Sequence, residues 1–139
     1  MVIRNTTPGE DGFRMPGEFE PHEGCMMIWP QRPGSWPNGA VEAQQTFTEI
    51  ARGIALSEHV WMLCMPEQRE QVERVFAKEQ NVTGLPIATD DAWARDVGPT
   101  VVTAEHLRRG IDWQFNAWGG LFDGLYAHWE QDNMAASAF

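Results

Sequence analysis

The sequence predicts an α/β fold in which helices pack on a mixed sheet. Two strand-sized apolar runs, residues 25–29 and 60–65, each stop at a proline. The segment after each run shows the apolar spacing or the charge pattern of a helix. Strands and helices that alternate along a chain are typical of layered α/β units.

The first helix is expected at about residues 40–57. Its apolar residues fall at i, i+3, i+4 and i+7, with polar residues between them: Phe47, Ile50, Ala51 and Ile54. Residues 31–39, which contain two prolines, read as the loop before it.

The second helix should begin just after Pro66. Glu67 and Glu70 place negative charge at its start, where the helix dipole favours it. Val72, Val75 and Phe76 then give the helix an apolar stripe.

Three further strands are expected. Residues 82–88 form a weaker strand, and Pro86 within them indicates an edge or a strand end. Residues 100–103 are rich in β-branched side chains. Apolar and polar residues alternate over residues 111–115, which predicts a half-covered strand. The predicted order is strand, helix, strand, helix, strand, loop, strand, strand.

Composition narrows the class of partner. The 139 residues carry a formal net charge of -10, which argues against a nucleic-acid binder. The acidity favours small cationic partners such as amines and guanidines, or it serves only solubility. No run is long enough to span a bilayer, and no secretory signal is visible, so we expect no membrane partner and a cytoplasmic location.

The cysteines and histidines give no local sign of catalysis or metal binding. Cys25 and Cys64 lie within apolar runs and are expected to be buried core thiols. His22 reads as a surface or capping residue, and the histidines lack zinc-ligand spacing, so no metal is predicted. No phosphate-binding glycine loop occurs, and no cofactor is predicted.

The densest group of functional side chains lies in residues 90–99. Asp90, Asp91 and Asp96 share this loop with Trp93. A carboxylate can hold a planar guanidinium through paired hydrogen bonds, and a tryptophan face can stack on the same cation. Alternatively, the aspartates form turns and caps while Trp93 is core. A third option is Mg²⁺ or Ca²⁺ binding, although the spacing is not that of a calcium loop.

A second candidate segment is residues 113–120. Asn116 could orient a ligand or a neighbouring loop, and Gly119–Gly120 permit close backbone approach. The alternative is an aromatic core strand followed by a turn.

Together with the leader at residues 13–21 and the stretch at residues 27–30, these segments resemble the agmatine deiminases of the pentein superfamily. The resemblance runs from about residue 12 to residue 132. It implies a five-module α/β propeller in enzymes much longer than this chain. The chain would supply an extended leader, residues 1–21, then the first module and the start of the next, residues 22–139.

The resemblance also implies a reaction and site residues. In the family a thiolate attacks the guanidinium carbon of agmatine, ammonia leaves, and water releases N-carbamoylputrescine. Asp96 corresponds to the guanidinium-binding aspartate and Trp93 to a residue of the substrate channel, while Asn116 and Trp118 would shape the site. The catalytic cysteine and histidine belong to later modules.

The chain is therefore expected to be part of a longer enzyme and to be inactive alone. Its uncovered apolar edges predict either marginal stability or self-association. Residues 135–139 depart from the helix that the family has there. Two other functions stay open: a peptidyl-arginine deiminase, or a non-catalytic module whose tryptophans bind cations or sugars.

Overall fold

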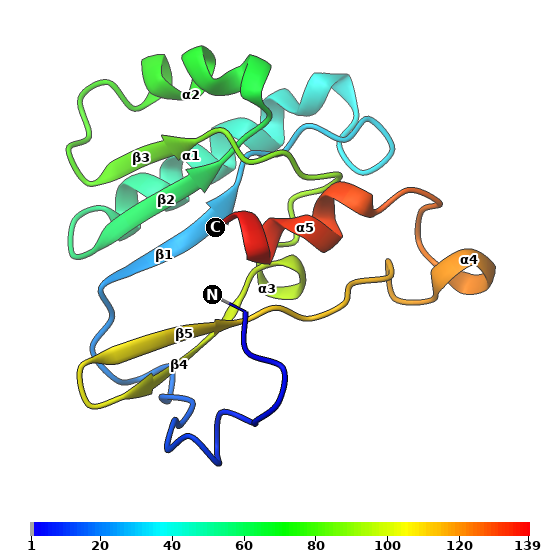
Figure 1. Cartoon of the computed structure of the whole chain (residues 1–139). Helices are drawn as coiled ribbons and strands as arrows, with labels where there is room; N and C mark the ends of the chain where they lie inside the picture. Colours follow the sequence, from blue (N-terminus) through cyan, green and yellow to red (C-terminus); the bar gives the residue numbers. More distant parts are fainter. Residues whose placement is uncertain (1) are drawn as a thin grey trace.

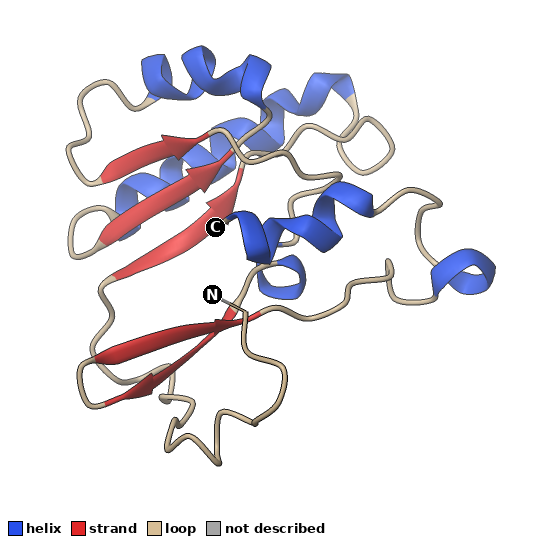
Figure 2. Cartoon of the chain, in the orientation of Figure 1, coloured by secondary structure: helices blue, strands red, loops and turns tan. Residues whose placement is uncertain are grey.

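A computed structural model, which describes residues 2–139, contains two sheets (Figures 1 and 2). Strands β1 (Gly24–Ile28), β2 (His59–Leu63) and β3 (Val82–Leu85) form a parallel sheet in the order β1-β2-β3. Gly24 is paired with His59, and Val60 with Val82. Strands β4 (Thr100–Ala104) and β5 (Leu107–Ile111) form a separate antiparallel hairpin.

Helices cover both faces of the parallel sheet (Figure 1). On one face lie α1 (Val41–Ile54), preceded by η1 (Asn38–Ala40), and α2 (Arg69–Val75), preceded by η2 (Pro66–Gln68). On the other face lie the one-turn helix α3 (Ala94–Val97) and the longer α5 (Glu130–Ala138). The short α4 (Gly120–Asp123) projects from the loop between β5 and α5. Within residues 2–139, no helix is both long and apolar enough to cross a membrane.

The face beneath α1 and α2 holds the first core cluster. Trp29, Met62 and Cys64 point to this face, where they meet Val72 and Phe76 of the α2 segment. Alternate residues of a strand face opposite sides of a sheet, which is why Leu63 belongs to the other cluster. Each fully buried large apolar side chain stabilises the fold by about 1.5–3 kcal/mol.

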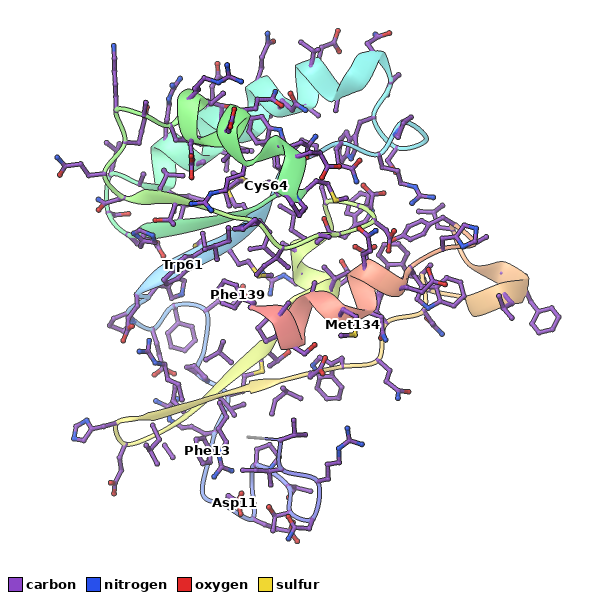
Figure 3. The ribbon with its side chains drawn as sticks, turned by 45° about the horizontal axis from the view of Figure 1, so that its top comes forward. Asp11, Phe13, Trp61, Cys64, Met134 and Phe139 are labelled. Atoms are coloured by element: carbon purple, nitrogen blue, oxygen red, sulfur yellow. The ribbon has the colours of Figure 1, made fainter. Side chains whose placement is uncertain are left out.

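The second core cluster joins the sheet to α3 and α5. Ile28 and Leu63 pack with Val97 of α3 and Ala135 of α5, all of them buried. At the end of α5, Phe139 lies against Trp61 of β2 with ring centroids 5.9 Å apart (Figure 3). The last helix therefore completes the core of the first sheet.

The predicted α/β class is confirmed, but the strands do not form one mixed sheet. Parallel and antiparallel strands lie in two sheets. The prediction of a strand at residues 111–115 was wrong, because β5 ends at Ile111. Beyond it, the Trp113 indole donates to Thr100 Oγ1 at 2.9 Å, and the Phe115 N–H donates to Asn133 Oδ1 of α5 at 2.8 Å. After Ile111 the chain no longer pairs with β4, because residues 113 and 115 bond to Thr100 and Asn133 instead.

The leader is folded rather than simply extended. Arg14 exchanges two backbone hydrogen bonds with Thr103 of β4, at 3.0 and 2.9 Å. Phe13 is buried at this point, with the Arg109 guanidinium 4.1 Å from its ring centroid. Residues 8–12 form the turns that precede this contact (Figure 3, Asp11 and Phe13). The leader is thereby attached to the hairpin.

Candidate functional site

Proteins of the α/β class commonly bind ligands beyond the carboxyl ends of their parallel strands. The loops that follow all three strands line an open pocket of about 350 Å³ here. Its walls include Gln31 after β1, Met65 after β2, and Thr89 and Asp90 after β3. The predicted residues Trp93, Asp96, Asn116 and Trp118 are not among the lining residues.

Three of the four predicted site residues come together from two segments. Asp96 is exposed on α3, and its Oδ1 accepts a hydrogen bond of 3.1 Å from the Trp118 indole Nε1. The Trp93 and Trp118 rings meet edge to face with centroids 6.0 Å apart. Their side chains remain 38% and 48% exposed. The result is an exposed carboxylate bonded to one accessible indole, which in turn packs against a second.

Gly98 sets α3 against the sheet. A Cβ atom added at Gly98 would lie 2.0 Å from Met26 Cε and 2.7 Å from the Ala94 carbonyl oxygen. Only glycine fits between the end of α3 and β1 at this distance. The close approach fixes the position of Asp96, two residues earlier.

Trp118 is held in an unusual backbone conformation. Ala117 and Trp118 both lie in the left-handed region, with φ of 52° and 63°. Such residues cost about 1–3 kcal/mol each and persist where the surroundings hold them. The Ala117 carbonyl accepts a 2.9 Å bond from Leu125 N–H, and the Phe115 ring packs 5.1 Å from that of Trp118. The left-handed backbone and the packing against Phe115 together orient the Trp118 indole toward Asp96.

Asn116 contributes to the turn through its backbone. Its carbonyl accepts the Gly120 N–H at 2.8 Å. Across residues 2–139 the Asn116 side chain makes no hydrogen bond with a protein group, and it is exposed. Asn116 therefore lies in the same turn as Trp118, but its side-chain amide makes no hydrogen bond to Asp96.

Asp90 and Asp91 serve the fold, as the turn-and-cap alternative describes. Asp91 is buried and accepts hydrogen bonds from the Ser35 hydroxyl, the Trp36 indole at 3.0 Å and the Ala92 N–H at 2.8 Å. Asp90 Oδ2 accepts the backbone N–H groups of residues 131 and 132, at 2.9 and 3.1 Å. It therefore caps α5 from a distant loop.

Asp132 is a supporting residue that sequence reasoning missed. Its side chain is 1% exposed, and its Oδ1 accepts the N–H groups of Asp90 and Asp91 at 2.8 and 3.2 Å. Its Oδ2 accepts the Tyr126 hydroxyl. Burial raises the pKa of Asp132, and burial together with this hydrogen bond also raises the pKa of Tyr126. No local pattern could reveal a partner 42 residues from Asp90.

The leader also contacts the candidate loop. Arg95 of α3 forms an ion pair with Glu18 at 2.5 Å, and Arg14 makes two hydrogen bonds of 2.7 Å to the Glu20 carboxylate. These pairs are exposed and add little stability. The Arg95–Glu18 pair nevertheless connects the leader to the loop at residues 90–99, whereas the Arg14–Glu20 pair lies within the leader.

The two thiols differ in burial. Cys64 is buried, as predicted, and burial raises its pKa to about 11. Cys25 is only half-buried, so the expectation of a core thiol was wrong for it. Burial and the neighbouring Glu58 carboxylate raise its pKa. Both thiols are therefore protonated, poor nucleophiles at neutral pH.

Solved structures share this architecture. The agmatine deiminase of Enterococcus faecalis superposes with a TM-score of 0.92 at 43% identity, over 97% of this chain and 37% of that one. The agmatine deiminase of C. jejuni gives a TM-score of 0.70 at 22% identity, a likeness of fold alone. The fold is that of the pentein class, as the sequence predicted.

The chain belongs to the Porphyromonas-type peptidyl-arginine deiminase family, whose model matches residues 14–139. The agmatine deiminase of Ectopseudomonas mendocina is 44% identical over 137 residues, which cover 98% of this chain and 37% of the relative. A Selenomonas ruminantium relative whose name also contains the words agmatine deiminase is 49% identical over 139 residues, covering 98% and 38%.

The chain spans only about 38% of the length of these curated relatives and corresponds to their amino-terminal portion. The family match extends through residue 139. The sequence departure expected at residues 135–139 therefore does not end the family match. In the structure these residues lie within or directly after α5.

Proposed function

We propose that this chain forms one wall of the substrate site of an agmatine deiminase, which hydrolyses agmatine to N-carbamoylputrescine and ammonia. The observation that carries the proposal is the exposed Asp96 carboxylate, which accepts a hydrogen bond from the Trp118 indole, while the exposed Trp93 ring packs against that indole. The relatives that share the segment and are named agmatine deiminases support it.

Asp96 would bind the substrate cation directly. Its Oδ1 is already oriented by the Trp118 N–H, while Oδ2 accepts no hydrogen bond from residues 2–139. A guanidinium N–H can donate to that oxygen, and the flat cation can lie against an indole face. Asn116 would shape the same wall. The net charge of -10 would favour the approach of such a cation.

The covalent step would fall to a thiolate outside this chain. Cys25 and Cys64, the two cysteines of the sequence, are protonated thiols and unsuited to attack on a guanidinium carbon. We therefore expect no ammonia release when the 139-residue chain is incubated with agmatine. Release at the rate of a full-length deiminase would contradict this assignment.

The test of the site is a substitution series in a full-length enzyme carrying this sequence. Asp96→Asn should lower kcat/KM for agmatine about 100-fold, since losing a hydrogen bond to a charged group costs up to about 3 kcal/mol. Trp118→Phe keeps the ring but removes the N–H that orients Asp96, and should have a smaller effect. Glu49→Gln, an exposed acid on α1, is the control. Near-normal activity of Asp96→Asn would remove Asp96 from the site.

Peptidyl-arginine is the alternative substrate, because the matching family carries that name. The relatives at 44–49% identity carry the name agmatine deiminase instead. Comparing kcat/KM for agmatine and for an arginine-containing peptide distinguishes the two. A preference for the peptide would overturn the proposed substrate.

We also propose a cytoplasmic location and a role in polyamine metabolism. Both cysteines are free thiols, which suits a reducing compartment, and the product is a putrescine derivative. Self-association is part of the proposal because apolar side chains of the α4 segment are exposed, Phe122 at 96%. Size-exclusion chromatography of the 139-residue chain checks this, and a monomer at all concentrations would contradict it.

A further inference from the structure

Three side chains of different chemistry converge where β1 and β2 begin. The ligand atoms of His22, Cys25 and Glu58 all lie within 4.8 Å of one another. Cys25 Sγ is 3.3 Å from Glu58 Oε2, and His22 Nδ1 is 3.5 Å from the same oxygen. The group lies at the amino ends of β1 and β2, at the sheet edge opposite the loops that line the 350 Å³ pocket (Figure 1).

The sheet holds this group in place. Cys25 belongs to β1, and His22 lies three residues before it on the incoming chain. Glu58 immediately precedes β2, whose pairing with β1 is fixed by the Gly24–His59 register and by a 3.4 Å bond from His59 N–H to the Glu23 carbonyl. A Cβ at Gly24 would lie 2.4 Å from the His59 carbonyl oxygen, so glycine permits the two segments to approach closely.

We propose that His22, Cys25 and Glu58 form a Zn²⁺ site with three protein ligands and a fourth position open to water. Zinc binds thiolate sulfur at about 2.3 Å and imidazole nitrogen and carboxylate oxygen at about 2.1 Å. At the tetrahedral angle these lengths place sulfur and oxygen about 3.6 Å apart, and nitrogen and oxygen about 3.4 Å apart. The observed 3.3 and 3.5 Å lie within about 0.3 Å of both values.

Charge and donor type select the metal. A thiolate and a carboxylate together supply two negative charges for a divalent ion, and the imidazole is neutral. Sulfur and nitrogen donors suit zinc, whereas Mg²⁺ and Ca²⁺ prefer oxygen alone. The His22 side chain is 43% exposed and that of Glu58 21%, which leaves the fourth position accessible to water. On binding, the ion displaces the Cys25 proton.

The ion would act as a clip on the fold. It would fasten the end of the leader at His22 to the first strand and to the turn before the second. Local spacing gave no zinc pattern because one ligand lies 33 residues away from Cys25. Without an ion, the same groups make a thiol–carboxylate hydrogen bond and a weak His–Glu contact, and the experiment separates these two cases.

The test is a Co²⁺ titration of the reduced 139-residue chain, followed by absorbance. We expect a thiolate-to-cobalt charge-transfer band and the intense visible bands of tetrahedral cobalt, saturating at one equivalent and abolished by added Zn²⁺. Cys25→Ser should remove the charge-transfer band. His22→Asn, on an exposed segment, should weaken binding by about tenfold or more, as should Glu58→Gln.

Two matched controls should retain the signal. Cys64→Ala removes the other thiol, and His106→Gln removes an exposed histidine outside the group. Far-ultraviolet circular dichroism checks that each variant is folded, and Zn²⁺ should raise the Tm of the wild type but not of His22→Asn. A folded wild type without the band, or a band that persists in Cys25→Ser, would overturn the site.

Discussion

Replacing Asp132 by alanine should destabilise the protein strongly, because this carboxylate holds the loop that leads to Asp96. The substitution leaves the N–H groups of Asp90 and Asp91 and the Tyr126 hydroxyl without their acceptor. Each buried donor left unsatisfied costs about 1–3 kcal/mol. Removing a buried carboxylate returns part of this, so we expect a net loss of about 3 kcal/mol.

Such a loss is a large part of the roughly 5–15 kcal/mol that stabilises a typical domain. For a chain of this size it corresponds to a fall in Tm of about 10 °C. Urea unfolding followed by circular dichroism measures the free energy, and thermal scans measure the Tm. Glu49→Ala, at an exposed position, should stay within about 0.5 kcal/mol of the wild type.

Asp132→Asn refines the test through pH. Since burial raises the pKa of Asp132 above the ordinary 3.8, the folded state favours the protonated carboxyl. Its contribution to stability is complete below pH 3.8 and is lost as the pH rises through the folded pKa. The stability of the wild type relative to Asp132→Asn should therefore fall as the pH increases from about 4. An alanine variant as stable as Glu49→Ala would refute the role of Asp132.

Three further predictions concern the thiols, the leader and the turn after α3. Cys64, with its pKa raised to about 11, should stay unmodified by a thiol reagent at pH 8 in folded Cys25→Ser; rapid labelling would contradict its burial. Glu20, whose pKa is lowered to about 2 by hydrogen bonds from Arg14 and the Gly17 N–H, should titrate by NMR near that value, and Arg14→Gln should move the midpoint back toward 4.5. The leader contact made by Glu20 is complete above pH 4.5 and is lost as the pH falls toward 2; an unshifted midpoint in the wild type would show that the pair does not form. Gly98→Ala should destabilise the fold by about 1–3 kcal/mol in urea unfolding, because its Cβ would meet Met26 and the Ala94 carbonyl oxygen. Gly34→Ala, which has open space around it, is the control and should not destabilise the fold. Equal stabilities of the two variants would rule out the tight packing of α3 on β1.

The parts of the fold that follow from local pattern were predictable. Continuous apolar runs that end at a proline predicted β1 and β2, and the helical spacing of apolar residues predicted α1. By contrast, β5 contains Arg108, Arg109 and Gly110, which carry no strand signal. It forms because it pairs with β4. The more strand-like Trp113 and Phe115 are instead held by Thr100 and Asn133.

The candidate site was predictable only in part, for a similar reason. The structure brings Trp118 into contact with Asp96 and Trp93, three residues that the family resemblance selected, and their roles in binding stay a prediction. The local sequence could not predict the different roles of Asp90 and Asp91. These roles depend on hydrogen bonds to Asp132 and to Ser35, which lie far away in the sequence. The convergence of Glu58 on Cys25 depends on strand pairing in the same way.

The reciprocal clamp between Asp90 and Asp132 has a consequence for biosynthesis. The parallel sheet, α1 and α2 can assemble as soon as β3 has left the ribosome, but the loop at Asp90 receives its acceptor 42 residues later. At about 5–20 residues per second, that interval lasts about 2–8 s. Throughout it, the face of β1 and β2 that later receives Ala135 can be covered only in part, by α3. A chaperone would therefore be most useful at this stage of translation.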